Sequence, residues 1–280
     1  MNSDVCASDP CVIFYDGDYP SKTFSKYPEN FDETTKYQGL HGDVDRYLEL
    51  FKVHGGPVLE LCCGTGRVGI PLAKAGAEIT CVDIAESMLS RFAKNIERID
   101  GNLNKQIELV HQDVTKLKLG HQNYRLALIP FNSLLCIPSF TGQMAALSAI
   151  ANHLAPDSRL VLDIVNPLRL KIDGDPIPKP FFTRKNPNNG NTYTRFAMCD
   201  AFDSDHKQRL HGWYDEIDQN GHLMRSHYSM HWRPIFRSEI VLMLEKAGLT
   251  IETIEGGHSK EAYTAQSSRM LIIAMKPAGR

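Results

Sequence analysis

Residues 57–69 read Pro-Val-Leu-Glu-Leu-Cys-Cys-Gly-Thr-Gly-Arg-Val-Gly, a short apolar run that leads directly into a glycine-rich turn. A second apolar run, residues 77–82, ends at Asp83, about twenty residues after the first glycine of that turn. A buried strand, a tight turn, a helix and an acidic residue at the end of the next strand form half of a nucleoside-binding fold. This stretch therefore predicts a type of ligand before the rest of the fold is considered.

The turn itself carries little side chain. Gly64 and Gly66 can adopt positive φ and let the backbone approach a ligand closely, with Thr65 between them. The helix expected after the turn, over residues 67–75, points its free N–H groups toward the same place. Asp83 can accept hydrogen bonds from two hydroxyl groups of a ribose, so this region is predicted to bind a nucleoside; the alternative is that Asp83 only caps the helix expected over residues 84–95.

Glu60 bears on which nucleoside cofactor is bound. A dinucleotide would bring a pyrophosphate into this crevice, and a nearby carboxylate would repel it. S-adenosylmethionine brings an ammonium group instead, so Glu60 favours the sulfonium cofactor. Residues 64–69 also satisfy the pattern G-x-G-x-x-G, however, and an NAD-dependent oxidoreductase stays open as an alternative.

Beyond these residues, the chain resembles the class I S-adenosylmethionine-dependent methyltransferases over roughly residues 40–277. Residues 58–68 resemble the first motif of that family, and residues 79–89 resemble its ribose-binding strand and the helix after it. Asp113, in Gln112-Asp113-Val114, resembles the carboxylate that binds the adenine amino group. Residues 126–133 resemble the fourth strand, where the methyl donor meets its acceptor.

Within this family, the chain is most similar to small-molecule enzymes such as the glycine and amino-sugar N-methyltransferases. Residues 161–167 and 268–277 are typical of that group. The resemblance implies S-adenosylmethionine as cofactor and a small-molecule acceptor, with nitrogen ahead of oxygen or carbon as the methylated atom. Cofactor contacts are expected at Glu60, Cys62, Gly64, Thr65, Gly66, Asp83, Ile84, Met88, Asp113, Val114 and Phe131.

Two features of this set of contacts leave alternatives open. Cys62 stands where members of the family usually carry glycine, and its side chain can narrow the methionine pocket or shift the turn. Met88 and Phe131 are equally consistent with cofactor contact and with core packing.

Composition and charge limit the kinds of molecule that the protein is expected to bind. The 280 residues carry a net charge of −2 and contain no long basic run, which argues against nucleic acid and for a small substrate. The seven cysteines form no C-x-x-C pair, so neither zinc nor a disulfide framework is predicted and no metal is expected. Without a signal-peptide pattern or a membrane-spanning run, we expect a cytoplasmic protein without a membrane partner.

The order of apolar segments predicts an α/β fold. Strands are expected near residues 57–61, 78–83, 106–111, 125–130 and 159–165, and helices near 43–53, 67–75, 85–98 and 140–153. Such alternation predicts a Rossmann-like, mostly parallel seven-stranded sheet with helices on both faces. A helix over 236–247 and strands over 249–255 and 269–276 are expected to complete the sheet, the last strand being reversed.

Four parts of the chain are predicted. Residues 1–40 are expected to be an N-terminal lid anchored by Tyr15, Tyr19, Tyr27 and Tyr37, with a loosely packed leader as the alternative. Residues 41–167 are the cofactor-binding core. Residues 168–235 are an antiparallel insertion that acts as a second lid, with a connection over 168–190 and strands near 192–202, 207–218 and 222–233; Asn220-Gly221 marks a hairpin. Residues 236–280 finish the core.

Substrate-binding and catalytic residues are less clearly marked. If the polar face of the strand near 222–233 looks toward the cofactor, His231 is the expected general base and Arg233 holds an anionic group; otherwise this is a solvated strand face. Tyr15 and Tyr37 are expected to contact the substrate from the N-terminal lid. Asn132 and Asn166, at strand ends, are expected either to orient the acceptor or to cap chain turns.

The predicted function is in-line methyl transfer from S-adenosylmethionine to a small molecule, driven mainly by proximity and by exclusion of water. An alternative from another class is a protein of the same fold that binds the cofactor without transferring the methyl group. The sequence does not identify the acceptor or the oligomeric state.

Overall fold

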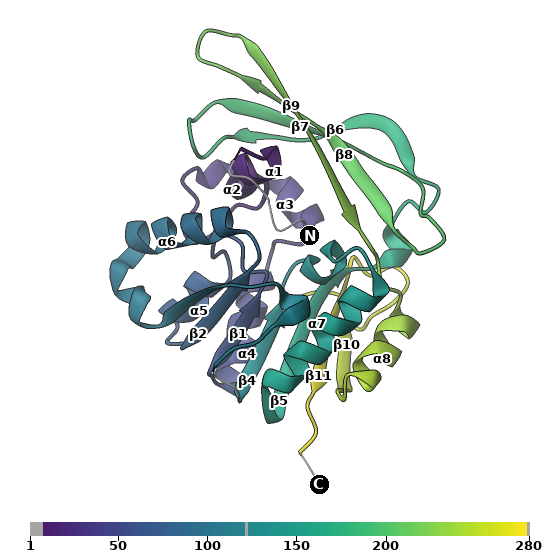
Figure 1. The fold of residues 1–280 in the computed structure, drawn as a ribbon. Coiled ribbons are helices and arrows are strands. Elements are labelled where there is room, and N and C mark those ends of the chain that lie inside the picture. Colours follow the sequence, from purple (N-terminus) through teal and green to yellow (C-terminus); the bar gives the residue numbers. More distant parts are fainter. Residues whose placement is uncertain (1–7, 121–122, 279–280) are drawn as a thin grey trace.

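A computed structural model describes residues 8–120 and 123–278 of the chain (Figure 1). Its centre is a seven-stranded sheet with the order β3-β2-β1-β4-β5-β11-β10. The first five strands are parallel, and β11 runs antiparallel to both of its neighbours. The strands are β1 (Val58–Leu61), β2 (Ile79–Asp83), β3 (Ile107–His111), β4 (Tyr124–Ile129), β5 (Leu154–Val165), β10 (Thr250–Glu255) and β11 (Arg269–Met275). The predicted fold class and the reversed last strand are confirmed.

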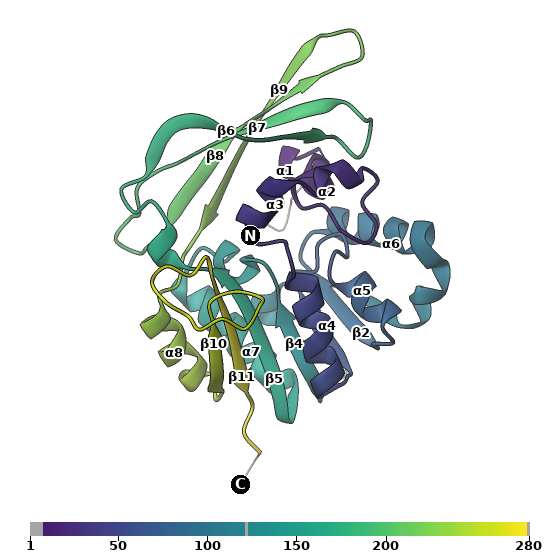
Figure 2. The same cartoon turned by 180° about the vertical axis from the view of Figure 1, so that it is seen from behind.

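Helices cover both faces of this sheet (Figures 1 and 2). One face is covered by α4 (Asp43–His54), α5 (Gly69–Lys74) and α6 (Glu86–Asp100), and the other by α7 (Phe140–His153) and α8 (Arg237–Lys246). The sheet is therefore buried on both sides, which explains why its strands read as nearly continuous apolar runs. Short 3-10 helices lie in the connections: η2 (Gly101–Lys105), η3 (Val114–Lys116), η4 (Ser133–Cys136) and η5 (Pro167–Arg169).

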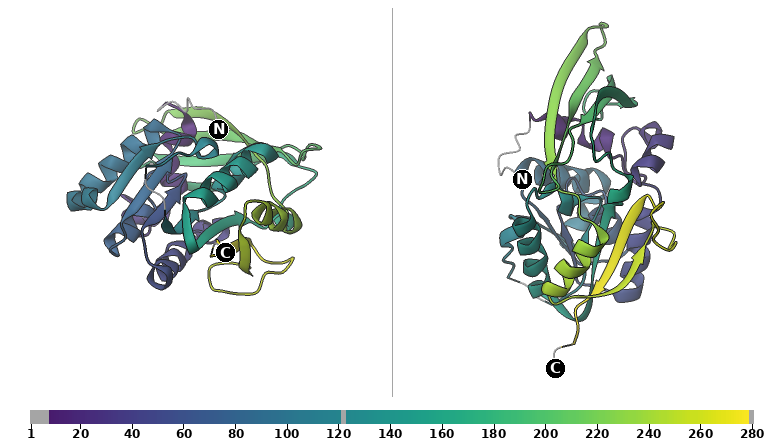
Figure 3. Two further views of the ribbon diagram at one scale, coloured as in Figure 1. Left: turned by 60° about the horizontal axis from the view of Figure 1, so that its bottom comes forward. Right: turned by 90° about the vertical axis from the view of Figure 1, so that its right-hand side faces the viewer.

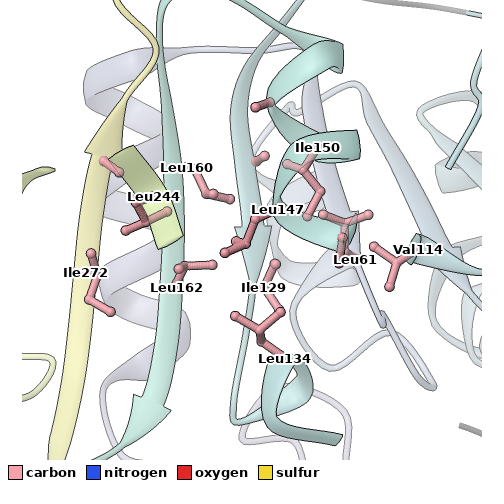
Figure 4. Close-up of a cluster of buried hydrophobic side chains, with 14 of the residues drawn as sticks. Leu61, Val114, Ile129, Leu134, Leu147, Ile150, Leu160, Leu162, Leu244 and Ile272 are labelled. Atoms are coloured by element: carbon pink, nitrogen blue, oxygen red, sulfur yellow. The ribbon is translucent and has the colours of Figure 1, made fainter. Parts of the chain in front are cut away.

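The core consists of two main apolar clusters, one on each face of the sheet. Figure 4 shows the cluster under α7, where Leu147 and Ile150 pack against Leu160, Leu162 and Ile129 of the sheet. Burying such side chains stabilises the fold by about 1.5–3 kcal/mol each. Both clusters lie beneath the carboxyl ends of the parallel strands and hold that edge rigidly.

Residues 8–40, here called the N-terminal segment, fold into short helices above the carboxyl edge of the sheet (Figure 2). These are α1 (Pro10–Ile13), α2 (Tyr15–Asp18), η1 (Pro28–Asn30) and α3 (Glu33–Gln38). Asp9 and Asp32 cap α1 and α3 by accepting hydrogen bonds from backbone N–H groups. None of these helices is long enough to be stable alone, so the segment depends on its tertiary contacts.

A second, four-stranded antiparallel sheet, here called the cap, lies over the N-terminal segment (Figures 1 and 3). Its strands are β6 (Asp175–Lys185), β7 (Thr192–Cys199), β8 (Gln208–Ile217) and β9 (Leu223–Trp232). The β8–β9 hairpin turns at Asn220-Gly221, where Gly221 has a φ of 82°, as the sequence predicted.

Strand β6 corrects one expectation, because residues 168–190 were predicted to be a connection. Prolines at positions 176, 178 and 180 suggested irregular chain. The strand forms nevertheless because β6 lies at the edge of the cap, where one side of the backbone needs no partner for its N–H groups.

Buried polar contacts join the N-terminal segment to the cap. Asp18 accepts hydrogen bonds from Tyr193 Oη (2.9 Å), Tyr214 Oη (2.7 Å) and Arg195 Nη1 (3.0 Å). Arg184 of β6 donates to the backbone carbonyl of Asp18 at 2.8 Å and to that of Gly17 at 3.0 Å. The cap and the N-terminal segment therefore form one connected body above the sheet.

Among residues 8–120 and 123–278, no helix has the length and apolar character needed to cross a membrane.

Candidate active site

The glycine-rich turn lies at the carboxyl end of β1 and has the predicted backbone. Gly64 and Gly66 have φ values of 57° and 94°, in the left-handed region that favours glycine. A Cβ on Gly64 would lie 2.7 Å from the hydroxyl of Tyr15, and one on Gly66 would lie 2.4 Å from the ring of Phe92. Both positions therefore need glycine for the backbone angle and for the space.

Asp83 ends β2 directly beside this turn, as predicted. One carboxylate oxygen accepts a hydrogen bond from the N–H of Gly64 and the other from the N–H of Ala85, both at 2.9 Å. The side chain is 8% exposed, and burial raises its pKa above the ordinary value. These bonds fix the carboxylate and leave further lone pairs to accept hydroxyl groups.

Glu60 corrects the electrostatic argument made from the sequence. Its residue is 1% exposed, and the carboxyl lies inside the turn, 3.6 Å from Cys81 Sγ and next to Gly69. Burial raises the pKa of Glu60 to about 8, so this group is largely uncharged at neutral pH. The carboxyl therefore lies beneath the turn and is not exposed on the surface of the crevice.

Cys62 precedes the turn with a φ of 56°, in the left-handed region where a side chain is costly. Its side chain is half-buried against the apolar cluster under α7. Burial holds the pKa of the thiol well above its usual value, so Cys62 is a packed, protonated thiol.

The ends of β2 and β3 provide the groups expected around an adenine. Asp113 caps η3 through one carboxylate oxygen, which accepts hydrogen bonds from the N–H and the hydroxyl of Thr115 at 2.8 Å each. Its other oxygen has no hydrogen bond within the described part of the chain. Met88 and Val114 are buried, and Ile84 is half-buried after Asp83. Two carboxylates separated by apolar side chains suit an adenosine.

Phe131, just after β4, is surrounded by groups that the sequence did not point to. Its ring centroid lies 5.4 Å from the guanidinium carbon of Arg67 and 5.0 Å from that of Arg269. The ring of Tyr19 meets it edge-on at 5.4 Å. Phe131 has a φ of 46°, which turns the chain at the end of the strand.

Both arginines are neutralised by buried carboxylates. Arg67 pairs with Asp43 at 2.6 Å, and Arg269 Nε donates to Asp163 at 2.8 Å. Asp163 also accepts hydrogen bonds from Tyr47 Oη at 2.7 Å and bonds with His258 Nε2 at 3.0 Å. Although burial opposes it, the charge of Arg269 and the His258 bond hold the pKa of Asp163 well below its usual value. These buried bonds hold Arg269 in place beside the ring of Phe131.

The N-terminal segment contacts the glycine turn directly. Asp16 accepts a hydrogen bond from Thr65 Oγ1 at 2.5 Å and pairs with Arg91 of α6 at 2.7 Å. Tyr15 packs against Gly64 and against the ring of Tyr19 at 5.0 Å. Tyr19 was expected only as an anchor, and nothing in the local sequence signalled Asp16, because its partners lie 49 and 75 residues away.

Asn132 and Asn166, at the ends of β4 and β5, form hydrogen bonds within the protein. The Asn132 side-chain oxygen accepts the N–H of Val165 at 2.7 Å and so links β4 to β5. Asn166 is fully buried, and its amide donates to three carbonyls of residues 264–267 while its oxygen accepts from Tyr263 and from the N–H of Leu168. Asn166 is therefore engaged on every side by the protein, which corresponds to the capping alternative.

Three other predicted residues are not brought to this edge. Tyr37 is 85% exposed on α3. His231 is exposed on the outer side of β9, because Tyr228 and Trp232 of the same strand take the buried side. Arg233 is buried, pairs with Glu239 and donates to Gln143 at 2.9 Å, so it fastens the end of β9 to the core. The condition for His231 and Arg233, a polar face toward the cofactor, is not met.

Comparison with known proteins agrees with this geometry. Residues 58–157 match the family model described as a methyltransferase domain. They include the glycine turn, Asp83, Asp113 and Phe131. The match identifies residues 58–157 as a methyltransferase domain, and the chain shares its fold with structures of S-adenosylmethionine-dependent methyltransferases. The NAD-dependent alternative is not supported.

Individual proteins similar to the chain are methyltransferases as well. The cypemycin N-terminal methyltransferase of a Streptomyces species is 26% identical over 219 residues, covering 78% of this chain and 82% of that protein. The CcbJ methyltransferase structure from Streptomyces caelestis superimposes with a TM-score of 0.72 at 23% identity, covering 85% and 90%. The CalS10 amino pentose methyltransferase structure from Micromonospora echinaspora gives 0.67 at 17% identity, covering 90% and 99%.

Proposed function

We propose that this methyltransferase transfers a methyl group to an amine nitrogen of a small molecule, bound at the carboxyl edge of the sheet beside Phe131. The main observation behind this proposal is that the N-terminal segment and the cap lie over the carboxyl edge of the sheet. The N-terminal segment lies on the glycine turn through Asp16 and Tyr15, and the cap is fastened to that segment through Asp18. A covered edge suits a small acceptor better than a polymer.

Relatives support the nitrogen preference. One similar sequence is named as an N-terminal methyltransferase, and one similar structure as an amino pentose methyltransferase. A sugar N-methyltransferase from Streptoalloteichus also shares the fold, with a TM-score of 0.67 at 15% identity. Amines of quite different molecules recur among these names, so the class of acceptor atom is proposed and its identity is left open.

The residues of the chain have distinct tasks in this proposal. Asp83 and Asp113 would hold the ribose and the adenine of S-adenosylmethionine, with Met88 and Val114 against the apolar surface. The bound cofactor supplies an activated methyl group on a sulfonium. Tyr15, Tyr19 and Phe131 would exclude water from the place where the acceptor meets it. Holding the acceptor in position is worth about 7–11 kcal/mol.

The proposed reaction uses no protein base. An amine must lose its proton before it can attack, and His231 lies on the outer surface of the cap, away from Phe131. We therefore propose that the amine is deprotonated by solvent before the N-terminal segment closes. His231→Ala is then expected to keep kcat within about twofold, since ordinary surface changes have small effects.

The test is to incubate the purified protein with S-adenosylmethionine and panels of small amines, alcohols and thiols. Release of S-adenosylhomocysteine and the mass of the product are measured, with Asp83→Ala as the inactive control. Methylation of amines alone is the expected result. A product methylated on oxygen or carbon contradicts the nitrogen preference. Tight cofactor binding without turnover, on these panels and on a metabolite extract, favours a protein that binds without transfer.

A further inference from the structure

A pocket of about 580 Å³ lies between α6 and the N-terminal segment, next to the glycine turn. Thr65 and Arg67 contribute to it from the turn, and Tyr19 from the segment. Pro187 and Asn188, in the connection between β6 and β7, complete its lining. Its volume is in the range of sites for small molecules.

The lining of this pocket is strongly basic. Five basic side chains and a single carboxylate, that of Asp16, line it; the basic residues are Lys26, Arg67, Arg91, Lys94 and Arg98. The chain as a whole carries a net charge of −2. The lining of this pocket is therefore more basic than the chain as a whole, and clefts lined by one sign of charge attract ligands of the opposite sign.

Only part of this charge is compensated by the protein. Arg67 pairs with Asp43 and Arg91 with Asp16. Lys26, Lys94 and Arg98 have no ion pair with any carboxylate of residues 8–120 and 123–278. Lys26 donates to a backbone carbonyl of the cap, and Arg98 donates to the carbonyl of Phe24 at 2.9 Å. Bonds to neutral carbonyl groups do not compensate the positive charges of these two side chains.

The basic residues of α6 are spaced so that they act together. Arg91, Lys94 and Arg98 are separated by three and four residues and share one face of the helix. Like charges at this spacing repel one another and destabilise a helix. Ser90 of α6 also lines the same pocket. Cations with neighbouring hydroxyl donors suit the oxygens of a phosphate.

We propose that this pocket binds a phosphate-bearing small molecule, held between α6 and the N-terminal segment. Lys94 and Arg98 contact the phosphate from the helix, and Lys26 contacts it from the segment. A ligand in this place stabilises the closed position of the segment, because it links the two sides of the pocket. The concave shape favours a small molecule over a nucleic acid strand, which would need a longer basic track.

Calorimetric titration of the full-length protein with pyrophosphate tests this site directly. The variant Lys94→Glu/Arg98→Glu is expected to lower the affinity by about tenfold or more, because two charged contacts become repulsive. Lys74→Glu/Lys105→Glu is the matched control: it changes the net charge equally at two exposed lysines outside the pocket, and it should alter the affinity less than about twofold.

Titration with S-adenosylmethionine separates this site from the proposed function. Both double variants should bind the cofactor like the wild type, and saturation with cofactor should leave pyrophosphate binding in place. The proposal is overturned if the wild type does not bind pyrophosphate or if the control loses as much affinity as the pocket variant. It is also overturned if the cofactor displaces pyrophosphate, or if a short RNA binds more tightly with a steep dependence on salt.

Discussion

Asp83 shows how a single carboxylate serves both the fold and the cofactor. Its two oxygens accept the N–H groups of Gly64 and Ala85 and thereby hold the glycine turn against the start of α6. The same carboxylate stands where a ribose is expected. A change at Asp83 therefore affects the ligand and the turn together, and the two effects have to be separated by experiment.

We expect Asp83→Ala to weaken S-adenosylmethionine binding at least about 30-fold, because hydrogen bonds to a charged group contribute about 1.5–3 kcal/mol. Asp83→Asn keeps one acceptor oxygen and should lose less. Calorimetric titration gives the affinities, and thermal unfolding shows whether each variant is folded. Wild-type affinity in a folded Asp83→Ala protein would remove the ribose assignment.

Variants of Cys62 measure how much a side chain in the left-handed region lowers the free energy of unfolding. Replacement by glycine relieves the backbone at a φ of 56° but removes a half-buried side chain, so Cys62→Gly should change the free energy of unfolding by no more than about 1 kcal/mol. Cys62→Val places a β-branched side chain there and should destabilise by about 2 kcal/mol. Urea unfolding measures both; equal stability of the two variants would contradict the backbone argument.

At the scale of the elements, the important contacts connect parts that are far apart in the chain. Arg184 of β6 is fully buried and donates to backbone carbonyls of α2 and to the side chains of Asp32, Thr34 and Gln38. It joins the edge strand of the cap to nearly the whole N-terminal segment. The short helices of the segment therefore owe their order to a strand about 150 residues later.

Arg184→Met is expected to destabilise the protein by about 2–4 kcal/mol, since it leaves buried acceptors without a donor. Amide hydrogen exchange of residues 9–38 should rise well before that of the core sheet. Arg209→Met is the control in the same cap: that side chain is 45% exposed and pairs with Asp200 at the surface. Its effect should stay within about 0.5 kcal/mol. Equal effects of the two variants would show that Arg184 does not hold the segment.

His258 makes stability depend on pH. Burial lowers the pKa of His258, but the bond and charge of Asp163 outweigh burial and raise it above 6.5. A group whose pKa is raised by folding contributes its full stability below its unfolded pKa and loses it as pH rises through the folded one. His258→Gln should therefore cost about 1–2 kcal/mol near pH 6 and less near pH 9, by urea unfolding. A loss that is the same at both pH values would contradict a charged His258.

At the scale of the whole molecule, bound cofactor is expected to stabilise the core sheet, the N-terminal segment and the cap together. Because Tyr15 and Asp16 lie on the glycine turn and Asp18 fastens them to the cap, a ligand at the turn stabilises all three parts. S-adenosylmethionine at about 100 times its Kd adds about 2.7 kcal/mol and should raise Tm by about 5–10 °C. NADH at the same concentration should leave Tm unchanged. The opposite pattern would contradict the assignment of the cofactor.

Several parts of the fold and site could be predicted from the sequence because their signals are local. Nearly continuous apolar runs predicted the strands of the core and apolar residues at helical spacing predicted its helices; α7 begins and ends at the predicted residues. Gly64, Gly66 and Asp83 were found because a tight turn restricts which residues can form it. The cap strand β6 was missed because proline normally opposes a strand and only its edge position allows it.

Taken by itself, the sequence determined the type of fold, the glycine turn and the acidic ends of β2 and β3, since each follows from neighbouring residues. Only the tertiary structure decided which face of β9 is buried, and thus that His231 points outward, because alternation defines two faces without choosing between them. Tertiary contacts also decided that Glu60 is buried beneath the turn, which raises its pKa, and that Asp16 bonds to Thr65 of the turn, because burial and long-range pairing depend on residues distant in the chain.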